Sequence, residues 1–253
     1  MDLVSIVVPF LNPNERFFRE AIDSVLAQSH PNWELLLVDD GSDETTRRIA
    51  AGMAEVRPGT IKLLQHDGHE NLGTSASRNL GIRHAVGNYI AFLDADDIWL
   101  PNKLAEQVSV LEAHREAAMV FSNTLYWYGW TGREADEMRD FLPRLGIRTP
   151  CLIPAPRYLE LSLRGRAAVP SASNIFLRRQ SVEAVGGFER SFRGLYDDQV
   201  FYAKIWLEHG VYIMPGHWDK YRQHEGSMCA VGAESSRCIN GTEGGSVVAE
   251  LAR

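Results

Sequence analysis

Hydrophobic and polar positions alternate in blocks along the first half of the chain, and each apolar block predicts one strand. Nearly continuous apolar runs occupy residues 4–9, 33–38 and 89–93, and residues 60–65 read as a further strand. Runs of this kind, bounded by polar turns, are typical of strands that are buried on both faces of a sheet. Four such strands are therefore predicted in the first half of the chain.

Helical spacing separates these runs. In residues 15–29 apolar side chains recur every three or four positions, which gives one wide apolar face. Ser42 is suited to cap a helix over residues 43–54, and Thr74 or Ser75 is suited to cap the next one. The repeated order of strand and helix predicts an α/β domain with a mainly parallel central sheet flanked by helices.

The second half of the chain has a less regular pattern. Its predicted elements are strands over residues 117–121, 173–177, 211–214 and 218–222 and helices over residues 179–185 and 197–209. The aromatic run from Tyr126 to Trp130 fits either a surface that stacks on a sugar or base, or a half-buried strand. Residues 134–148 are charged and predict a mobile surface loop, and the small, polar residues of 230–253 predict a flexible tail.

Composition narrows the classes of function. The 253 residues include 33 acids against 26 lysines and arginines, and a net charge of −7 disfavours nucleic-acid binding as the main role. Three scattered cysteines match neither a disulfide framework nor a metal motif, which favours a reducing cytoplasm. No signal-peptide pattern and no apolar run of ~20 residues is present. We therefore expect a cytoplasmic protein, with any membrane contact peripheral and at the inner face.

Three polar clusters stand where predicted strands end. They are Pro9-Phe10-Leu11-Asn12, Asp39-Asp40-Gly41-Ser42 and Asp94-Ala95-Asp96-Asp97. In parallel α/β sheets, ligands bind outside the carboxyl ends of the strands, so this coincidence predicts one shared pocket. The alternative for the third cluster is a solvated acidic turn that caps the following helix.

The residue types in this pocket suit a nucleoside diphosphate held with a divalent metal. Asp94 and Asp96 are two positions apart and point to the same side of an extended backbone, as a shared hard cation requires. Asp39 can accept from ribose hydroxyls or a base N–H, and Arg78 can place positive charge beside a diphosphate. Asp198, at a predicted helix start, is the candidate that deprotonates an acceptor hydroxyl, although capping of that helix is an alternative.

In this order, the clusters and several further motifs resemble the family-2 glycosyltransferases, which have the nucleotide-diphospho-sugar transferase fold called GT-A. The resemblance covers residues 4–227, which is nearly all of the chain. Its motifs are Ile6-Val7-Val8-Pro9-Phe10 with Asn12, Val38-Asp39-Asp40-Gly41-Ser42 with Asp43, Asn71-Leu72-Gly73, Ser77-Arg78-Asn79 with Gly81, Phe92-Leu93-Asp94-Ala95-Asp96-Asp97, Gly186-Gly187-Phe188, Tyr196-Asp197-Asp198 and Tyr221-Arg222-Gln223-His224.

The resemblance implies a role for each matching residue. Asp39 corresponds to the acid that binds the uracil or its equivalent, and Asp96 to the direct metal ligand, with Asp94 nearer the ribose. His224 aligns with a histidine that reaches the metal or diphosphate in some members, although it also fits a polar core or surface histidine. The residues implied to contact the nucleotide sugar are Pro9, Phe10, Asn12, Asp39, Asp40, Asn71, Arg78, Asp94, Ala95 and Asp97, and the implied metal ligands are Asp94, Asp96 and His224.

The implied reaction is an inverting transfer. An acceptor hydroxyl, deprotonated by Asp198, attacks the anomeric carbon opposite the departing nucleoside diphosphate. The implied cofactor is Mn²⁺ or Mg²⁺ and the implied donor is a UDP-sugar. The acceptor is a glycan, a lipid-linked sugar or a small molecule, as expected of an enzyme of polysaccharide, glycolipid or other glycoconjugate biosynthesis.

The resemblance also implies how the chain is divided. Residues 1–229 would form one domain, with a nucleotide-sugar-binding half over 1–122 and an acceptor-binding half over 123–229. Lys204 stands where many members have arginine, and no Gln-x-x-Arg-Trp signature of processive synthases is present, which favours a single transfer. Two alternatives stay open: a non-catalytic sugar-nucleotide-binding module of a larger synthase, and a sugar-1-phosphate nucleotidyltransferase. The latter is disfavoured because residues 9–12 lack a glycine-rich, basic loop.

Overall fold

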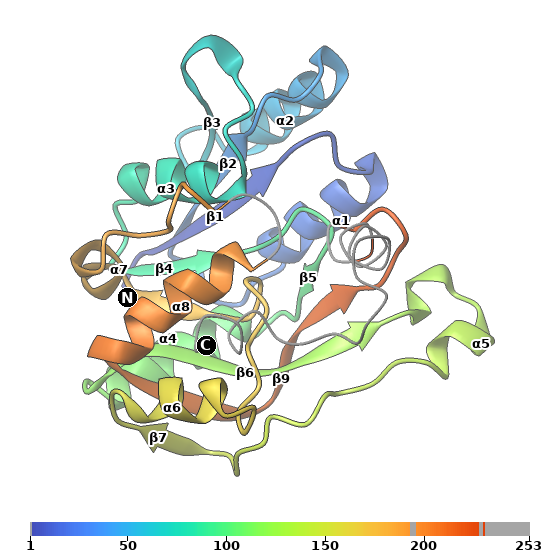
Figure 1. Cartoon of the computed structure of the whole chain (residues 1–253). Coiled ribbons are helices and arrows are strands. Elements are labelled where there is room, and N and C mark those ends of the chain that lie inside the picture. Colours follow the sequence, from blue (N-terminus) through green and yellow to red (C-terminus); the bar gives the residue numbers. More distant parts are fainter. Residues whose placement is uncertain (1, 193–195, 228–229, 231–253) are drawn as a thin grey trace.

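The first half of the chain folds into four adjacent parallel strands. The structure is a computed structural model that describes residues 2–192, 196–227 and 230 (Figure 1). Its first four strands are β1 Val4–Phe10, β2 Trp33–Asp39, β3 Ile61–Gln65 and β4 Tyr89–Phe92. They lie in the order β3-β2-β1-β4, and each pair is parallel. The four strands and their parallel pairing agree with the prediction from the hydrophobic pattern.

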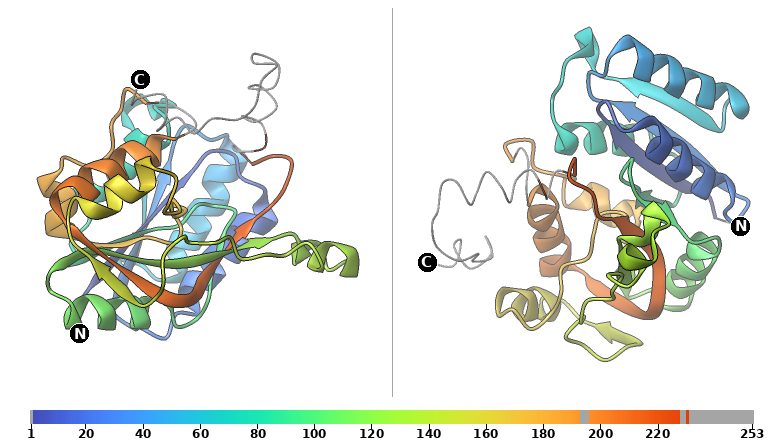
Figure 2. Two further views of the ribbon diagram at one scale, coloured as in Figure 1. Left: turned by 60° about the horizontal axis from the view of Figure 1, so that its bottom comes forward. Right: turned by 90° about the vertical axis from the view of Figure 1, so that its right-hand side faces the viewer.

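Alternating side chains of these strands fill two apolar cores, one on each face of the sheet. Along β1, Ile6 and Val8 enter one core and Val7 enters the other. This explains why the strands read as continuous apolar runs rather than alternating ones. One face is covered by α1 Glu15–Leu26, α2 Glu44–Val56 and α4 Lys103–Ala113, and the other by α3 Thr74–His84, α6 Arg157–Leu163, α7 Arg179–Ala184 and α8 Asp197–Glu208 (Figure 2, right).

The second half continues the same sheet with mixed pairing. Its strands are β5 Ile98–Trp99, β6 Ala117–Trp127, β7 Cys151–Ile153, β8 Phe176–Arg178 and β9 Gly210–Arg222. Strand β8 pairs antiparallel with both β4 and β6, and β6 pairs parallel with β9. Within the described residues the strands form one nine-stranded sheet in the order β3-β2-β1-β4-β8-β6-β9-β5, with β7 on β9. The α/β fold class is as predicted, and its parallel part is the first half.

Several elements of the second half differ from the prediction. The strands predicted over residues 211–214 and 218–222 are one continuous strand, β9. The strand predicted to end at Phe121 continues to Trp127, because β6 pairs with β9 along its length through several bulges. Residues 134–148, predicted as a loop, begin with the short helix α5 Glu134–Glu137 at the end of a projecting arm (Figure 2, left). Strands β5 and β7 and helix α6 were not predicted.

The predicted helix caps were wrong at two positions, because the hydroxyl groups serve other contacts. Asp43, not Ser42, caps α2 by accepting a hydrogen bond from the Thr46 N–H. Residue 73, a glycine, precedes α3 without a side-chain cap, and the hydroxyl of Ser75 donates to Asp197 instead. The predicted tail lies outside the described residues from 231 onward. No helix in the described ranges is long and apolar enough to cross a membrane.

Candidate active site

The register of the sheet brings the three polar clusters to one edge. Strand β1 lies between β2 and β4, and Val7 is paired with both Leu36 and Phe92. Asp39 is the last residue of β2, three beyond Leu36, and Asp94 lies two beyond Phe92, the last residue of β4, so both stand at their strand ends at a similar level. Since neighbouring strands are ~4.8 Å apart, the two acids flank the end of β1 at roughly 10 Å from one another.

The loops that follow β1 and β2 are tied together by Asn12. This residue has a left-handed φ of 43°. Its backbone N–H donates to the Ser42 hydroxyl at 3.2 Å, and its side-chain oxygen accepts from the Asp43 N–H at 2.8 Å. Pro9 and Phe10 are buried just before it. The first cluster therefore fixes the second cluster in place, and Asn12 is exposed at the edge.

Asp39 carries an acceptor atom that its surroundings leave unfilled. Its side chain is 1% exposed, and Oδ1 accepts from the Ser42 N–H at 2.8 Å. Among the described residues, Oδ2 has no hydrogen-bond donor and faces Nδ1 of His69 at 3.6 Å. Nε2 of His69 lies 2.8 Å from the Ser42 carbonyl oxygen, so Nε2 is the protonated nitrogen. No sequence pattern indicated His69, which follows Gly68 in a left-handed conformation.

Asp40 holds the loop that carries Asn71. Its carboxylate accepts from the backbone N–H groups of Leu72 at 2.9 Å and Gly73 at 3.0 Å, and His66 lies 3.5 Å away. Burial lowers the pKa of His66, although Asp40 opposes that shift. Asn71 itself is exposed at the edge. Asp40 thus positions the loop, and the predicted contact of either residue with a nucleotide sugar stays a prediction.

Arg78 links the acidic loop after β4 to the start of α8. It is 4% exposed; Nη2 donates to Asp94 at 2.9 Å, and Nη1 donates to Asp197 at 3.3 Å. Burial disfavours the charged form of Arg78, but the carboxylates of Asp94 and Asp197 outweigh this effect and raise its pKa. Both ends of the guanidinium are therefore occupied by protein carboxylates, so the predicted contact with a diphosphate stays a prediction.

Asp198 stands beside this ion-pair chain. Helix α8 begins after Tyr196, which has a φ of 72°, and the first two helical residues are Asp197 and Asp198. Burial raises the pKa of Asp198 to about 6, to which the charges of Asp197 and Asp94 add while Arg78 lowers it. A carboxyl group that titrates near 6 is ionised at neutral pH and basic enough to accept a proton from a hydroxyl group in a transition state.

The acidic loop after β4 has exposed and buried members. The side chains of Asp94 and Asp96 are 33% and 30% exposed, whereas Asp97 is fully buried and Ala95 nearly so. Asp97 accepts from the Ser173 hydroxyl at 2.6 Å, and that hydroxyl accepts from the Asp94 N–H at 3.1 Å. Burial raises the pKa of Asp97 well above its usual range, and Asp96 and Asp94 raise it further. Asp97 supports the loop, and its predicted ligand contact stays a prediction.

His224 and Arg222, from the end of β9, lie against the same loop. Nε2 of His224 is 2.9 Å from Oδ2 of Asp96, and the Phe17 ring is 5.2 Å from the imidazole. Nε of Arg222 donates to the Asp96 carbonyl oxygen at 2.7 Å, and Nη2 donates to Glu20 at 2.6 Å. The structure thus brings together two residues predicted to bind metal, although they are about 130 residues apart in sequence.

The donor chemistry fits a divalent cation that takes most of its ligands from a bound substrate. Asp94 and Asp96 offer partly exposed carboxylate oxygens, and like charges this close favour a cation between or beside them. No three histidine, cysteine, aspartate or glutamate side chains among the described residues form a complete metal site. His224 already contacts Asp96, so it fits as a ligand or as the partner that orients that carboxylate.

A buried polar network supports this loop from the second half of the sheet. Asn174, just after Ser173, donates through its amide to Asp219 and Thr124, and its carbonyl oxygen accepts from Lys103 at 2.7 Å. Asn174, Lys103 and Asp219 are all fully buried. Burial lowers the pKa of Lys103 to about 7, although Asp219 opposes the shift. Sequence reasoning missed this network, because its members are single polar residues in or beside segments that were predicted only as strands or helices.

Comparison with protein families matches most of the chain, including the strand-end clusters and Arg78 but not Asp198 or His224. The family model described as "Glycosyl transferase family 2" matches residues 5–186. A putative glycosyltransferase, EpsE of Bacillus subtilis, is 42% identical over 122 residues, which are 48% of this chain and 43% of the relative. The Escherichia coli protein named UDP-Glc:alpha-D-GlcNAc-diphosphoundecaprenol beta-1,3-glucosyltransferase WfgD is 39% identical over 127 residues, 50% of this chain and 45% of its own. Each match thus spans less than half of the relative.

Two solved structures have a fold similar to that of most of the chain. Staphylococcus aureus TarS 1-349 in complex with UDP-GlcNAc superposes with a TM-score of 0.69 at 20% identity, covering 91% of this chain and 61% of that one. The mannosyltransferase PcManGT from Pyrobaculum calidifontis, in complex with GDP-Man and Mn²⁺, has a TM-score of 0.66 at 20% identity. The match covers 93% of this chain and 61% of that one. At this level of identity the likeness establishes a shared fold.

Proposed function

The chain belongs to glycosyl transferase family 2 and has the GT-A fold, and on this premise we propose that it transfers a sugar from a nucleotide-diphospho-sugar to an acceptor hydroxyl in glycan biosynthesis. The observation that supports the proposal most is the ion-pair chain Asp94–Arg78–Asp197. It joins the strand-end edge to the helix start that carries Asp198, so the proposed donor site and the candidate base would lie beside one another.

The nucleotide would lie across the ends of β1, β2 and β4. Asp39 would bind the base, because its unfilled buried oxygen needs an N–H donor that a nucleobase can supply. Asp94 and Ala95 would lie nearest the ribose and sugar. The remaining proposed contacts at this edge are Pro9, Phe10, Asn12, Asp40, Asn71, Arg78 and Asp97, of which the buried members would act by holding the loops.

A divalent cation, Mn²⁺ or Mg²⁺, would be held by Asp96 and Asp94 with His224 beside them. The donor set supports this assignment, and the similar mannosyltransferase structure contains Mn²⁺. When bound, such an ion stabilises negative charge on the diphosphate that leaves. Arg222 would keep Asp96 in place through its hydrogen bond to the Asp96 carbonyl oxygen.

Asp198 would act as the general base of an inverting transfer. Its carboxylate takes the proton of the acceptor hydroxyl while the hydroxyl oxygen forms a bond to the anomeric carbon. The bond from that carbon to the diphosphate breaks on the opposite face, and its electron pair leaves with the nucleoside diphosphate. Arg78 and Asp197 hold the start of α8 against the acidic loop after β4, so they would position Asp198 for this step.

The remaining assignments follow the two halves of the chain. Residues 1–122 would bind the nucleotide sugar and residues 123–229 the acceptor, within one domain. A UDP-sugar is the proposed donor, since WfgD and the TarS complex are named with UDP-sugars, although PcManGT is named with GDP-Man. The acceptor would be a glycan, a lipid-linked sugar or a small molecule, encountered in the cytoplasm or at the inner face of the membrane.

A thermal-shift screen tests the donor site directly. UDP, GDP, ADP and CDP are added with and without Mn²⁺ to the wild type, to Asp96→Ala and to the exposed control Asp23→Ala. We expect one nucleotide to raise the melting temperature in the presence of Mn²⁺, because ligands that bind the folded state stabilise it. The shift should persist in Asp23→Ala and disappear in Asp96→Ala. No shift with any nucleotide would overturn the proposal, and binding without sugar transfer to any acceptor would indicate a non-catalytic module.

A further inference from the structure

The second half of the chain contains a surface whose charge is opposite to that of the whole protein. Residues 141–170 contain five arginines and a single acid, Glu160, in a chain whose net charge is −7. Only Arg157 of these arginines is paired with Glu160, at 2.7 Å. Exposed arginines from two segments, residues 142–148 and 163–166, therefore give this surface an excess of positive charge.

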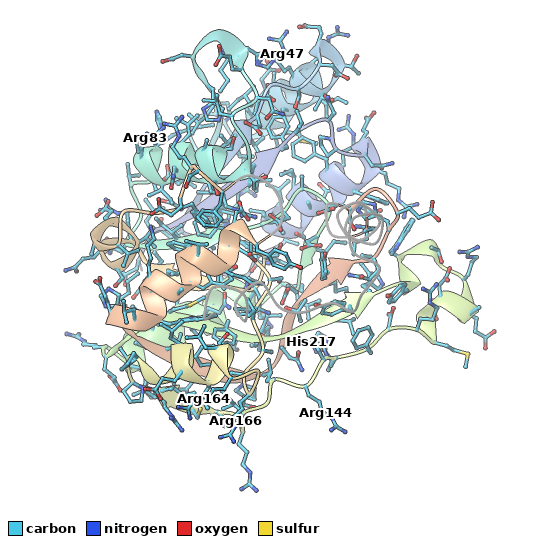
Figure 3. The ribbon with its side chains drawn as sticks, viewed as in Figure 1. Arg47, Arg83, Arg144, Arg164, Arg166 and His217 are labelled. Atoms are coloured by element: carbon cyan, nitrogen blue, oxygen red, sulfur yellow. The ribbon has the colours of Figure 1, made fainter. Side chains whose placement is uncertain are left out.

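The two segments lie side by side. The Ala168 N–H donates to the Leu145 carbonyl oxygen at 3.0 Å. A side chain at Gly146, which has a φ of 75°, would lie 2.1 Å from the Arg166 carbonyl oxygen, so the two backbones are in direct contact. Figure 3 places Arg144, Arg164 and Arg166 along the lower edge of the molecule, with their side chains directed outward. We name the surface formed by both segments the basic edge.

Apolar side chains are exposed among these arginines. Leu142 is 46% exposed and Leu163 is 45% exposed, and each lies within two residues of Arg144 or Arg164. Exposed leucines and arginines can both contribute binding free energy at a surface that has a negatively charged layer with an apolar layer beneath it. The arginines contact the charged layer and the leucines enter the apolar one. The interface of an anionic lipid bilayer has this arrangement, whereas the phosphate backbone of a nucleic acid offers charge alone.

We propose that the basic edge binds the surface of an anionic lipid bilayer. Arginines would contact the lipid phosphates, and Leu142 and Leu163 would enter the boundary between headgroups and acyl chains. The basic edge lies in the half of the chain proposed to bind the acceptor, outside the ion-pair chain of the candidate active site. The proposal concerns binding alone and does not depend on the proposed sugar transfer.

Vesicle flotation tests this proposal with a matched pair of variants. Arg164→Glu/Arg166→Glu reverses the charge at two positions of the basic edge. Arg48→Glu/Arg83→Glu makes the same change in net charge on α2 and α3. In Figure 3, Arg83 lies near the top of the molecule, away from the basic edge. The vesicles contain phosphatidylcholine with or without phosphatidylglycerol. Melting temperatures are recorded for each protein, and the milder Arg164→Gln/Arg166→Gln is used if the first variant does not fold.

We expect the wild type and Arg48→Glu/Arg83→Glu to float with phosphatidylglycerol vesicles and not with pure phosphatidylcholine. Arg164→Glu/Arg166→Glu should bind at least about 20-fold more weakly, because each arginine near an anionic surface contributes roughly a five-fold gain in binding. Leu142→Ser/Leu163→Ser should weaken binding even in high salt, where charge attraction is screened. Equal losses in both arginine pairs, no binding by the wild type, or tighter binding to duplex DNA than to the vesicles would overturn the proposal.

Discussion

The two halves of the sheet satisfy their polar groups in different ways. In the first half, carboxylates at the strand ends accept from backbone N–H groups of nearby loops, as Asp39 does from Ser42 and Asp40 from Gly73. In the second half, the polar side chains are buried inside the sheet layer and contact one another, as Asn174 and Asp219 do. At the carboxyl ends of its strands the first half therefore presents polar atoms at an edge, whereas the second half uses this buried network as internal support.

The difference matters because the two halves meet at the acidic loop after β4. Asp94 and Asp96 of this loop belong to the exposed edge, but Asp97 is held from the second half by Ser173 and the Arg222 N–H. The proposed donor site thus depends on contacts with residues more than seventy positions away in sequence. Substitutions at the edge should change chemistry with little loss of stability, whereas substitutions beneath it should change both.

The largest expected effect is on transfer, at Asp198 beside the strand-end edge. Asp198→Asn should lower the rate of sugar transfer by about 10²–10⁴-fold, the usual contribution of a general base, while nucleotide binding persists. The wild-type rate should rise with pH up to about 6 and then level off, because Asp198 must lose its proton to act and burial raises its pKa to about 6. Initial rates of transfer between pH 5 and 8 measure both expectations.

Stability provides the control for Asp198→Asn. The folded-state pKa of Asp198 is raised from 3.8 to about 6, so its contribution to stability is present below pH 4 and is lost as pH rises through 6. The asparagine variant has no carboxyl group to ionise, so it avoids this loss of stability. It should be more stable than the wild type at pH 8, by up to about 3 kcal/mol. An inactive variant that also melts earlier at pH 8 would point to misfolding, and full activity would remove Asp198 as the base.

A smaller effect on transfer, with a larger loss of stability, is expected beneath the edge. Ser173→Ala removes the hydroxyl that joins Asp94 to Asp97 and leaves a buried carboxylate oxygen and a backbone N–H without that partner. We expect the free energy of unfolding to fall by about 1–3 kcal/mol. Because the loop loses its support, the Mn²⁺ concentration needed for half-maximal nucleotide binding should rise by roughly ten-fold.

Ser171→Ala is the matched control for Ser173→Ala. Ser171 donates to Asp219 at 3.3 Å, but Asp219 keeps its hydrogen bonds from Asn174 and Thr124. This variant should lose less than about 1 kcal/mol and keep the Mn²⁺ dependence of the wild type. If both serine variants change the Mn²⁺ dependence equally, the support for the loop is spread over the whole network and is not specific to Ser173.

The same contrast explains how far the sequence predicts the structure. The strands and helices of the first half follow from hydrophobic periodicity, because β1, β2 and β4 are buried on both faces and each helix turns an apolar face to one of the two cores. In the second half, β9 reads as two strands because Pro215 and Gly216 interrupt its pattern, although pairing with β6 carries it through. Strand β7 has three residues and α6 has seven, which is too few to define a period.

The candidate site divides in the same way. The acids at the strand ends could be predicted, because the α/β topology places the carboxyl ends of parallel strands at one edge. The buried roles of Ser173 and Asn174 could not, because a single serine or asparagine carries no periodic signal and its partners are distant in sequence. His69 was missed for a similar reason, since only the fold brings its imidazole to Asp39.

The smallest expected effect lies in the first half, where contacts are local. The side chain of Asn14 caps α1 by accepting from the N–H groups of Arg16 and Phe17. Asn14→Ala should lower the free energy of unfolding by about 1 kcal/mol, because those N–H groups lose their acceptor. Asn14→Asp keeps an acceptor and adds a negative charge at the helix N-terminus, so its stability should match or exceed that of the wild type. Urea unfolding measures both variants.

Nucleotide binding decides whether this change stays local. Glu20 of α1 pairs with Arg222, which holds Asp96, and Phe17 of α1 packs directly on His224 with the ring centroids 5.2 Å apart. We expect these contacts to survive, because the apolar face of α1 is anchored by several buried residues and not by its cap. The Mn²⁺-dependent thermal shift of Asn14→Ala should therefore equal that of the wild type. A weaker shift would mean that the strand-end edge also depends on contacts outside its own loops. The two halves of the sheet would then differ only in degree.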